Sequence, residues 1–267
     1  MHYQEIAPDP RLRAYIKCFW TLKGTDPAPV PERVLPDGRC ELVLHCGDAF
    51  ERVDEDGTRT QPRDLFVGPS TRAIVIKSGT AIDLVAVRFH PGGAALLLAA
   101  PLSELRDQAP GCSELDVRFG LDLFDALHER SALERSALLQ EILLQRLEHS
   151  RADTQMLRLQ RVIERARGNL RIENLARHSG LSLRQLQRRF RAATGVSPKA
   201  MSRLARLQSV LTLAREPNTT LGRVAARAGY SDQSHFTREF HELAGVAPRV
   251  YFNATNQLNE MFFSGIE

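Results

Sequence analysis

The chain has 267 residues, 43% of them hydrophobic and 25% charged, so it can bury a sizeable core and is too long for one ordinary small domain. This composition excludes a disordered or fibrous protein, and no apolar run reaches the roughly 18 residues of a membrane span. The first residues lack the basic start and apolar run of a secretory signal, which predicts a cytoplasmic protein.

The formal net charge of +4 is distributed unevenly. Residues 1–150 hold 17 Lys and Arg against 23 Asp and Glu, whereas residues 151–254 hold 19 against 7. Basic side chains that neutralise phosphates release counterions, which supplies most of the sequence-independent affinity for nucleic acid. We therefore expect one domain at residues 1–150, a nucleic-acid-binding domain at residues 151–254, and a tail at residues 255–267.

The first block begins as a β-rich region. After the proline-rich residues 27–38, the run Glu41–His45 predicts a strand. Asp54–Gly57 predicts a hairpin turn, and further short strands are expected at Phe50–Val53, Ala73–Lys77 and Ile82–Phe89. Short strands separated by turns favour a small sandwich or barrel.

Helical patterns follow His90 and make this block α+β. Pro91 can open a helix through Ala94–Ala99, Ser103 can cap another, and Asp116–His128 and Ala132–His149 have helical spacing. The last pattern carries an apolar stripe that predicts either a core face or a subunit interface, formed by Leu138, Leu139, Ile142, Leu143 and Leu147.

The four cysteines are interpreted as packing residues. Cys18, Cys40, Cys46 and Cys112 match no zinc ribbon or redox spacing. A zinc ion held by Cys40, His45 and Cys46 is disfavoured because adjacent residues of a strand point to opposite faces. We expect no metal and no cofactor.

An internal repeat is the most specific feature of the second block. Leu175–Ser182 aligns with Val224–Ser231 at an offset of 49 residues, and Phe190, Gly195, Val196 and Pro198 recur 50 residues later. Each copy has an amphipathic helix, a Gly turn and a second helix, capped by Ser182 in the first copy and by Ser231 or Asp232 in the second. This order predicts two helix-turn-helix units, whose second helix enters a major groove of DNA.

The two second helices carry the candidate DNA contacts. Their apolar sides are predicted to contain Leu183, Leu186 and Phe190 in the first copy and Phe236 and Phe240 in the second. Arg pairs with guanine and Gln with adenine on the base edges of the major groove. The outward-facing candidates are Arg184, Gln185, Gln187, Arg188 and Arg191, and then Gln233, Ser234, Thr237, Arg238 and His241. Between the copies, a helix over Lys199–Arg215 spans about 26 Å and can hold the two units apart.

These motifs resemble a known family. The segments SGLSLRQLQRRFRAATGVSPKAM and AGYSDQSHFTREFHELAGVAPRVY are similar to the DNA-binding domain of AraC/XylS-type transcriptional regulators, over about residues 153–254. The resemblance implies an all-α domain of two helix-turn-helix units on a long linker helix. It places base contacts at Arg184, Gln187, Arg188, Gln233, Ser234, Thr237 and Arg238. Two departures from the family pattern are Arg189, where an apolar residue is usual and whose charge is expected to remain for a phosphate, and Ala247 before Pro248.

The first block resembles an effector domain of some such regulators more loosely, through LPDGRCELVLHCG, FVGPS and VRFHPGGAALLL. We therefore expect a non-enzymatic, sequence-specific regulator that binds double-stranded DNA. A small organic effector is expected between the strands Leu42–His45 and Ile82–Phe89. RNA polymerase is a candidate partner, and the protein is expected to be a monomer or a homodimer with no membrane contact.

The sequence is compatible with two alternatives for the first block. The first block could be an enzyme fused to a DNA reader, with His90 as a conceivable catalytic residue, although no partner nucleophile is recognisable. It could instead serve only to pair subunits of a DNA-binding protein.

Overall fold

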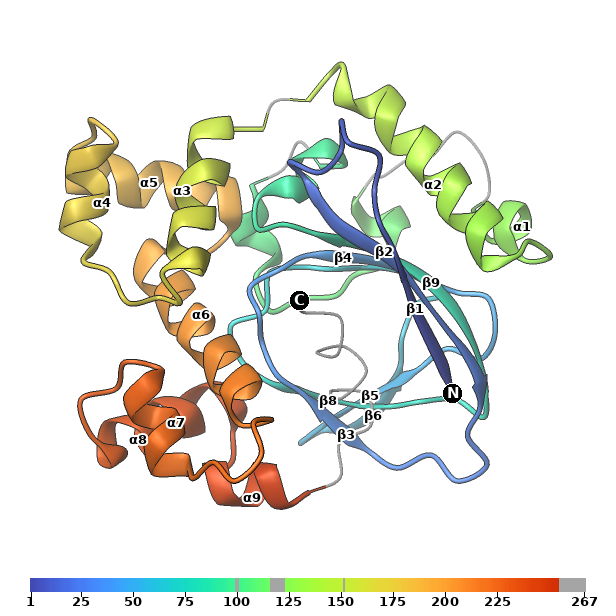
Figure 1. The fold of residues 1–267 in the computed structure, drawn as a ribbon. Coiled ribbons are helices and arrows are strands. Elements are labelled where there is room, and N and C mark those ends of the chain that lie inside the picture. Colours follow the sequence, from blue (N-terminus) through green and yellow to red (C-terminus); the bar gives the residue numbers. More distant parts are fainter. Residues whose placement is uncertain (99–100, 116–122, 151, 255–267) are drawn as a thin grey trace.

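The computed structural model describes residues 1–98, 101–115, 123–150 and 152–254. The predicted tail at residues 255–267 lies outside this part, as do residue 99 of one predicted helix and residues 116–122 of another. Two bodies pack side by side, a β-rich one built from the first half of the chain and a helical one built from the second (Figure 1).

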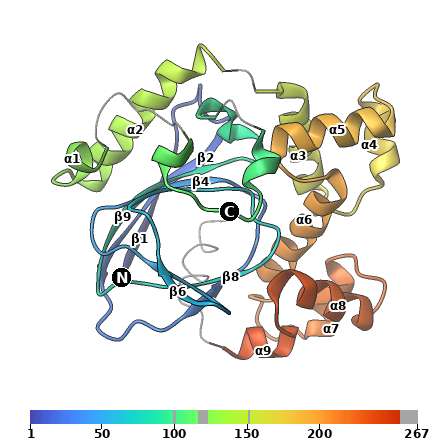
Figure 2. The same ribbon diagram turned by 180° about the vertical axis from the view of Figure 1, so that it is seen from behind.

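Two antiparallel sheets form the β-rich body. One sheet has the strand order β1-β2-β9-β4-β7 and the other has the order β3-β8-β5-β6. The strands are β1 His2–Ile6, β2 Ile16–Thr25, β3 Glu32–Val34, β4 Glu41–His45, β5 Glu51–Asp54, β6 Gly57–Thr60, β7 Asp64–Val67, β8 Ile74–Lys77 and β9 Ala81–Phe89. The sheets face each other as two layers, which confirms the predicted sandwich-like region (Figure 2).

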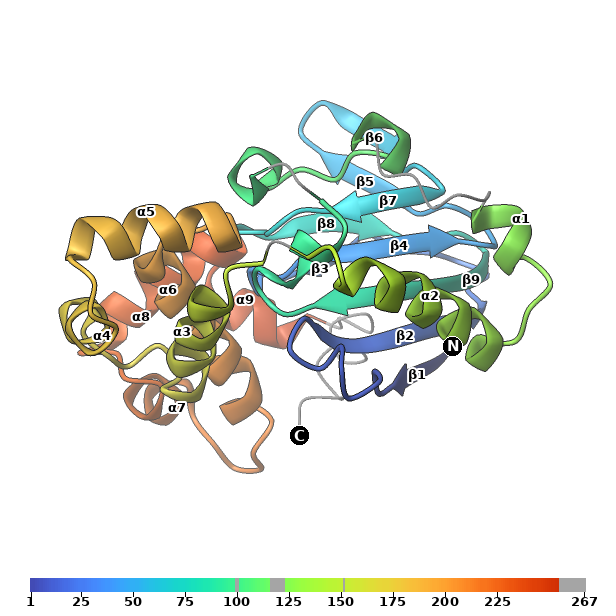
Figure 3. The same ribbon diagram turned by 90° about the horizontal axis from the view of Figure 1, so that it is seen from above.

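Alternation along the central strands gives this body two cores. In β4, Val43 packs between the sheets with Trp20 and Leu84, whereas Leu42 and Leu44 point to the opposite face. Helix α2 (Ala132–Leu147) lies across that outer face, over β9 and β2 (Figure 3). Its stripe belongs to the same core, since Leu139, Ile142 and Leu143 are buried and Leu138 and Leu147 pack against them. The core alternative for this stripe is therefore the one that the structure supports.

The helical predictions after His90 need correction. Pro91 is followed only by a short 3-10 turn at Gly93–Leu96, and the next turn, Leu102–Leu105, contains Ser103 instead of being capped by it. Pro101 precedes that turn and has extended backbone angles, which fixes its start one residue before Ser103. A third 3-10 turn covers Cys112–Leu115, and the short helix α1 covers Leu123–Leu127.

The second body is entirely helical in its described residues. Its elements are α3 Thr154–Arg165, α4 Ile172–His178, α5 Leu183–Thr194, α6 Pro198–Leu213, α7 Leu221–Arg227, α8 Gln233–Ala244 and α9 Pro248–Asn253. Helix α6 runs between the α3–α5 group and the α7–α9 group (Figure 1). Pro198 at its first turn starts this helix, and its 16 residues span about 24 Å. None of the helices in the described ranges is long and apolar enough to cross a membrane.

Candidate nucleic-acid interface and ligand pocket

Helix α5 is the second helix of the first repeat, and its start and end are set by local contacts. The Ser182 hydroxyl accepts a hydrogen bond from the backbone N–H of Gln185 at 3.2 Å, and the Gln185 side chain accepts one from the Ser182 N–H at 2.9 Å. Gly195 ends the helix in the left-handed conformation, with φ of +78°. Leu186 and Phe190 are fully buried beneath it.

The outer side of α5 presents the predicted polar residues to solvent. Arg184, Gln187 and Arg188 are exposed, and Gln185 is exposed while its side-chain oxygen also holds the helix cap. The prediction that Leu183 lies on the buried side is wrong, since this residue is 38% exposed. Leu183 is the first residue of the helix, and helical side chains lean toward the N-terminus, so it projects beyond the core.

Arg189 differs from its predicted role. Its guanidinium pairs with the carboxylate of Asp153, the N-cap residue of α3, at 2.8 Å. The charge that was expected to remain for a phosphate therefore connects α5 to α3. The sequence does not predict this contact, because Arg189 and Asp153 lie 36 positions apart and no local pattern relates them.

Helix α8 repeats the arrangement in the second unit. Asp232, not Ser231, is the cap residue, and its carboxylate accepts from the His235 N–H at 2.7 Å. Phe236 and Phe240 are buried and stack edge-on with ring centroids 5.8 Å apart. The exposed side chains on the opposite side are those predicted, Gln233, Ser234, Thr237, Arg238 and His241.

A buried carboxylate fixes α8 to α6. Glu239 is a buried residue, and both Arg206 and Arg203 of α6 contact it, at 3.0 and 3.1 Å. Burial by itself would raise the pKa of Glu239, but the hydrogen bonds and charge of Arg206 and the charge of Arg203 hold that pKa below its ordinary value. Arg206 also donates to the Gly168 carbonyl, between α3 and α4, at 3.4 Å, so this cluster joins the linker helix to both units.

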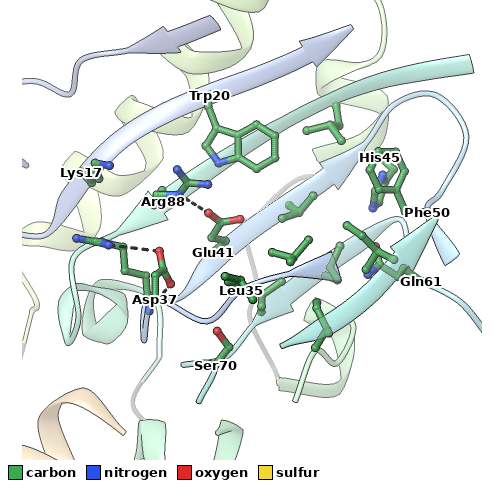
Figure 4. Close-up of a pocket in the computed structure, with 18 residues that line it drawn as sticks. Lys17, Trp20, Leu35, Asp37, Glu41, His45, Phe50, Gln61, Ser70 and Arg88 are labelled. Atoms are coloured by element: carbon green, nitrogen blue, oxygen red, sulfur yellow. Dashed lines mark hydrogen bonds and ion pairs between the residues drawn. The ribbon is translucent and has the colours of Figure 1, made fainter. Parts of the chain in front are cut away.

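A pocket lies between the two sheets of the β-rich body (Figure 4). Its volume is about 120 Å³. The predicted strands line it through alternate residues of β4 and β9, namely Glu41, Val43 and His45, and Leu84 and Arg88. Strands β2, β3, β7 and β8 complete the walls. Their contribution could not be predicted from the sequence, because only the pairing of strands within the sheets brings them together. Cys46 packs against the outer core, so it points away from His45 as predicted.

One end of the pocket is charged. Arg88 donates to Glu41 at 2.5 Å and lies over the Trp20 ring, 5.6 Å from its centroid. Burial raises the pKa of Glu41, and the adjacent Arg88 opposes this. Lys17 and Asp37 line the same end, as Figure 4 shows. Arg39, which pairs with Asp37, is also part of this wall.

The opposite end contains His45 beside Phe50, with ring centroids 5.2 Å apart. Burial lowers the pKa of His45 to about 4, so its imidazole is neutral at pH 7. The unfolded chain binds a proton on this side chain near pH 6.5, whereas the folded chain does so only near pH 4. The contribution of neutral His45 to stability is therefore complete above about pH 6.5 and declines as the pH falls toward 4.

We expect His45→Gln to weaken this acid sensitivity. The thermal unfolding temperature of the unmodified protein should fall between pH 7 and pH 5, and the fall should be smaller in the variant. His90, whose pKa burial lowers to about 3, contributes to the same fall. An equal fall in both proteins, measured by differential scanning calorimetry, would show that His45 does not control it.

Residues 33–39 join the pocket to the helical body. Leu35 lines the pocket and also belongs to the core formed with α6, α7 and α8. Gln208 of α6 donates to the Pro36 carbonyl at 2.9 Å, and Arg39 pairs with Glu164 of α3 at 2.5 Å. Gly38 has φ of +72°, a conformation that favours Gly, and a Cβ there would lie 2.8 Å from the Leu204 side chain of α6, which would have to move.

Other interface contacts join the first unit to the β-rich body. Arg161 of α3 donates to the Ala14 carbonyl at 2.7 Å. A Cβ at Gly195, the end of α5, would meet the Leu102 carbonyl oxygen at 2.8 Å. Both helix-turn-helix units therefore contact the first half of the chain.

Two protein families match separate parts of the chain. Residues 175–254 match the family described as "Helix-turn-helix domain", and residues 4–110 match "Domain of unknown function (DUF6597)". The HTH-type transcriptional activator RhaR of Pectobacterium atrosepticum is 36% identical over 81 residues, which cover 30% of this chain and 28% of that protein. The chain thus spans less than a third of the length of this relative.

Two further proteins align over most of the chain. An HTH-type transcriptional regulator of Haemophilus influenzae is 25% identical over 80% of this chain and 63% of that protein. The structure of ToxT from Vibrio cholerae aligns with 98% of this chain and 99% of that chain, with 10% identity and a TM-score of 0.49.

Proposed function

We propose, from the premise that residues 175–254 form an AraC-type helix-turn-helix domain, that this protein is a transcriptional regulator that binds specific DNA sequences through α5 and α8. One observation carries the proposal. Each second helix is anchored by a buried Phe and presents exposed Arg, Gln, Ser or Thr side chains on its outer side. These are the side-chain types that read base edges in the major groove.

The proposed base-reading set is the predicted one, Arg184, Gln185, Gln187, Arg188, Gln233, Ser234, Thr237 and Arg238. On α5, Gln187 and Arg188 follow Arg184 by three and four positions. Residues at these spacings are neighbours on a helix, so the three side chains form one surface. The excess of Lys and Arg over Asp and Glu in residues 151–254 supplies the non-specific attraction to phosphates. Two recognition helices on one linker are suited to successive major grooves of one duplex.

We expect Arg188→Ala and Arg238→Ala each to weaken binding to the preferred DNA sequence by about 1–3 kcal/mol, since each Arg is proposed to read a base edge. Binding sites would first be selected from a random duplex library, and affinities then measured by fluorescence anisotropy at fixed salt. Arg59→Ala, in the exposed β5–β6 hairpin, is the matched control and should leave affinity unchanged. Equal losses on selected and scrambled duplexes would mean that these arginines contact only phosphate.

We further propose that the pocket between the sheets binds a small effector that alters DNA affinity. The support is that residues 33–39 form part of the pocket wall and also contact α3, α6 and the carbonyl of Ala244 at the end of α8. A ligand that moves this segment would change how the two units are held. Coupling of about 1–3 kcal/mol between effector and DNA is typical of such switches.

The regulator is proposed to act in the cytoplasm, as a monomer or homodimer, with RNA polymerase as a candidate partner and without catalysis. A purely dimerising role for residues 1–150 is the alternative. A substitution that fills the pocket distinguishes effector binding from dimerisation as the role of residues 1–150. Leu84→Trp should abolish an effector response and leave the oligomeric state unchanged. Sedimentation velocity and DNA binding on the same sample would measure both.

A further inference from the structure

The pocket between the sheets has an apolar body and a charged end. Its apolar walls come from both sheets and include the buried residues Trp20, Leu35, Phe50, Leu65, Ile76 and Leu84. One buried water needs roughly 10–15 Å³ of such volume, so about 120 Å³ accommodates a ligand of about ten non-hydrogen atoms. The body of a fitting ligand is therefore small and apolar.

The cations at the charged end differ in their partners. Arg88 is paired with Glu41, and Arg39 is paired with Asp37 and Glu164. Lys17 has no carboxylate within 4.0 Å among the residues that the structure describes. Lys17 is also partly buried, so water solvates its ammonium group less completely than at an open surface.

The surroundings of Lys17 favour an added negative charge. Burial lowers the pKa of Lys17, and the positive charges of Arg39 and Arg88 lower it further, whereas Cys18 and Glu5 oppose this more weakly. A bound anion would stabilise the protonated amine and offset both effects. A ligand cation at this end would instead have to compete with Arg39 and Arg88 for the carboxylates of Asp37 and Glu41.

The far end of the pocket places a limit on the ligand. His45 is neutral at pH 7, so it provides no positive charge for a second anionic group. Beyond the charged end, the polar side chains that line the pocket are His45, Gln61 and Ser70. The far end therefore has too few donors and acceptors for a ligand that carries hydroxyl groups along its whole length.

We infer that the effector is a small amphipathic monocarboxylate, whose carboxylate binds Lys17 and whose apolar part fills the space between the two sheets. The role of this ligand as an effector rests on the proposed function, whereas its binding to the pocket does not depend on it. The carboxylate lies next to Arg39, which contacts Glu164 of α3. Its arrival would compete with Glu164 for Arg39, and this is the route by which the ligand would reach the helical body.

Binding of matched probes to the full chain tests this ligand class. Phenylacetate and octanoate each have about ten non-hydrogen atoms, as the pocket volume requires. Isothermal titration calorimetry would compare each acid with its amide, which has the same shape and no charge. We expect the acid to bind at least about tenfold more tightly, because a charge-assisted hydrogen bond to a partly buried amine is lost in the amide.

Four variants test whether the preference for acid over amide depends on Lys17 and on the pocket. Lys17→Gln should remove the preference for acid over amide, and Lys17→Arg should retain it. Lys23→Gln, on the same strand but 75% exposed and outside the pocket wall, is the control and should bind as the unmodified protein does. Ile76→Trp should abolish binding of acid and amide alike, and thermal unfolding would verify that each variant folds.

The inference is overturned if the amide binds as tightly as the acid, if Lys17→Gln keeps the preference, or if binding survives in Ile76→Trp. Failure of both acids to bind a folded protein at millimolar concentration also overturns it. DNA binding is measured separately on the same samples. Acid-selective binding without any specific DNA binding would contradict the regulatory function but support the ligand class. Specific DNA binding without acid-selective ligand binding would contradict only the ligand class.

Discussion

Replacing Phe240 by alanine is expected to lower the free energy of unfolding of the second helix-turn-helix unit by about 3–5 kcal/mol and to abolish specific DNA binding. Phe240 is fully buried. Its ring centroid lies 5.8 Å from that of Phe236, 5.6 Å from that of Tyr251 and 5.7 Å from that of Phe252. Truncation leaves a cavity beneath α8 and removes the contacts that fix its exposed side relative to DNA.

The internal repeat supplies a matched comparison for this prediction. Phe190 holds the equivalent position in the first unit and is equally buried, so Phe190→Ala should cost a similar amount. Urea denaturation followed by far-ultraviolet circular dichroism would report both changes, since both units are helical. A loss below about 1 kcal/mol would mean that the site collapses around the missing ring, and that Phe240 does not control the placement of α8.

Arg206→Ala is expected to destabilise the helical body by about 3 kcal/mol. Removing one partner of a buried ion pair costs about 3–5 kcal/mol because the remaining charge stays buried, and Arg203 still pairs with Glu239, which favours the lower figure. The substitution also removes the contact of Arg206 with the Tyr230 ring, 5.6 Å from its centroid. Chemical denaturation would measure the loss.

Two further variants separate the ion pair from general packing. Arg203→Ala should cost less, since Arg203 is more exposed than Arg206 and makes its other contact with the exposed Glu242. Combining Arg206→Met with Glu239→Met should recover most of the stability, because no charge is then left unpaired. If the double variant is as unstable as Arg206→Ala, shape and not charge explains the effect.

The same cluster predicts a pH dependence of stability. The folded-state pKa of Glu239 lies below its ordinary value, so its contribution is present above about pH 4.3 and is lost as the pH falls through the lower, folded-state value. This window lies below that of His45, which begins near pH 6.5. Unfolding measured separately near pH 5.5 and near pH 3.5 distinguishes the two.

The helix-turn-helix units could be predicted because their signals are local. Ser182 caps a helix that begins one residue later, and Gly195 ends it by adopting a backbone conformation that few other residues tolerate. The offset of about 50 residues then repeated the same signals in the second unit. Burial of Leu186, Phe190, Phe236 and Phe240 followed from helical periodicity alone.

Predictions for the first half succeeded where alternation was the guide and failed where a short helix was inferred from one residue. The turn at Asp54–Gly57 joins β5 to β6 as expected. Pro91 and Ser103 are suited to helix starts, but the segments that follow them form single 3-10 turns. Short helices are marginal by themselves, and these two turns pack against α2 and α5, contacts that depend on the tertiary structure.

The sequence by itself determined the two helix-turn-helix units, the residues exposed on α5 and α8, and the strands on which a pocket would be built, because each depends on residues within a few positions of one another. Only the tertiary structure decided which ionised groups meet. Arg39 and Glu164 are 125 positions apart, and the charged end of the pocket combines Lys17 of β2, Arg88 of β9 and the segment before β4. Long-range pairing of this kind depends on strand order and domain packing, neither of which leaves a periodic pattern in the chain.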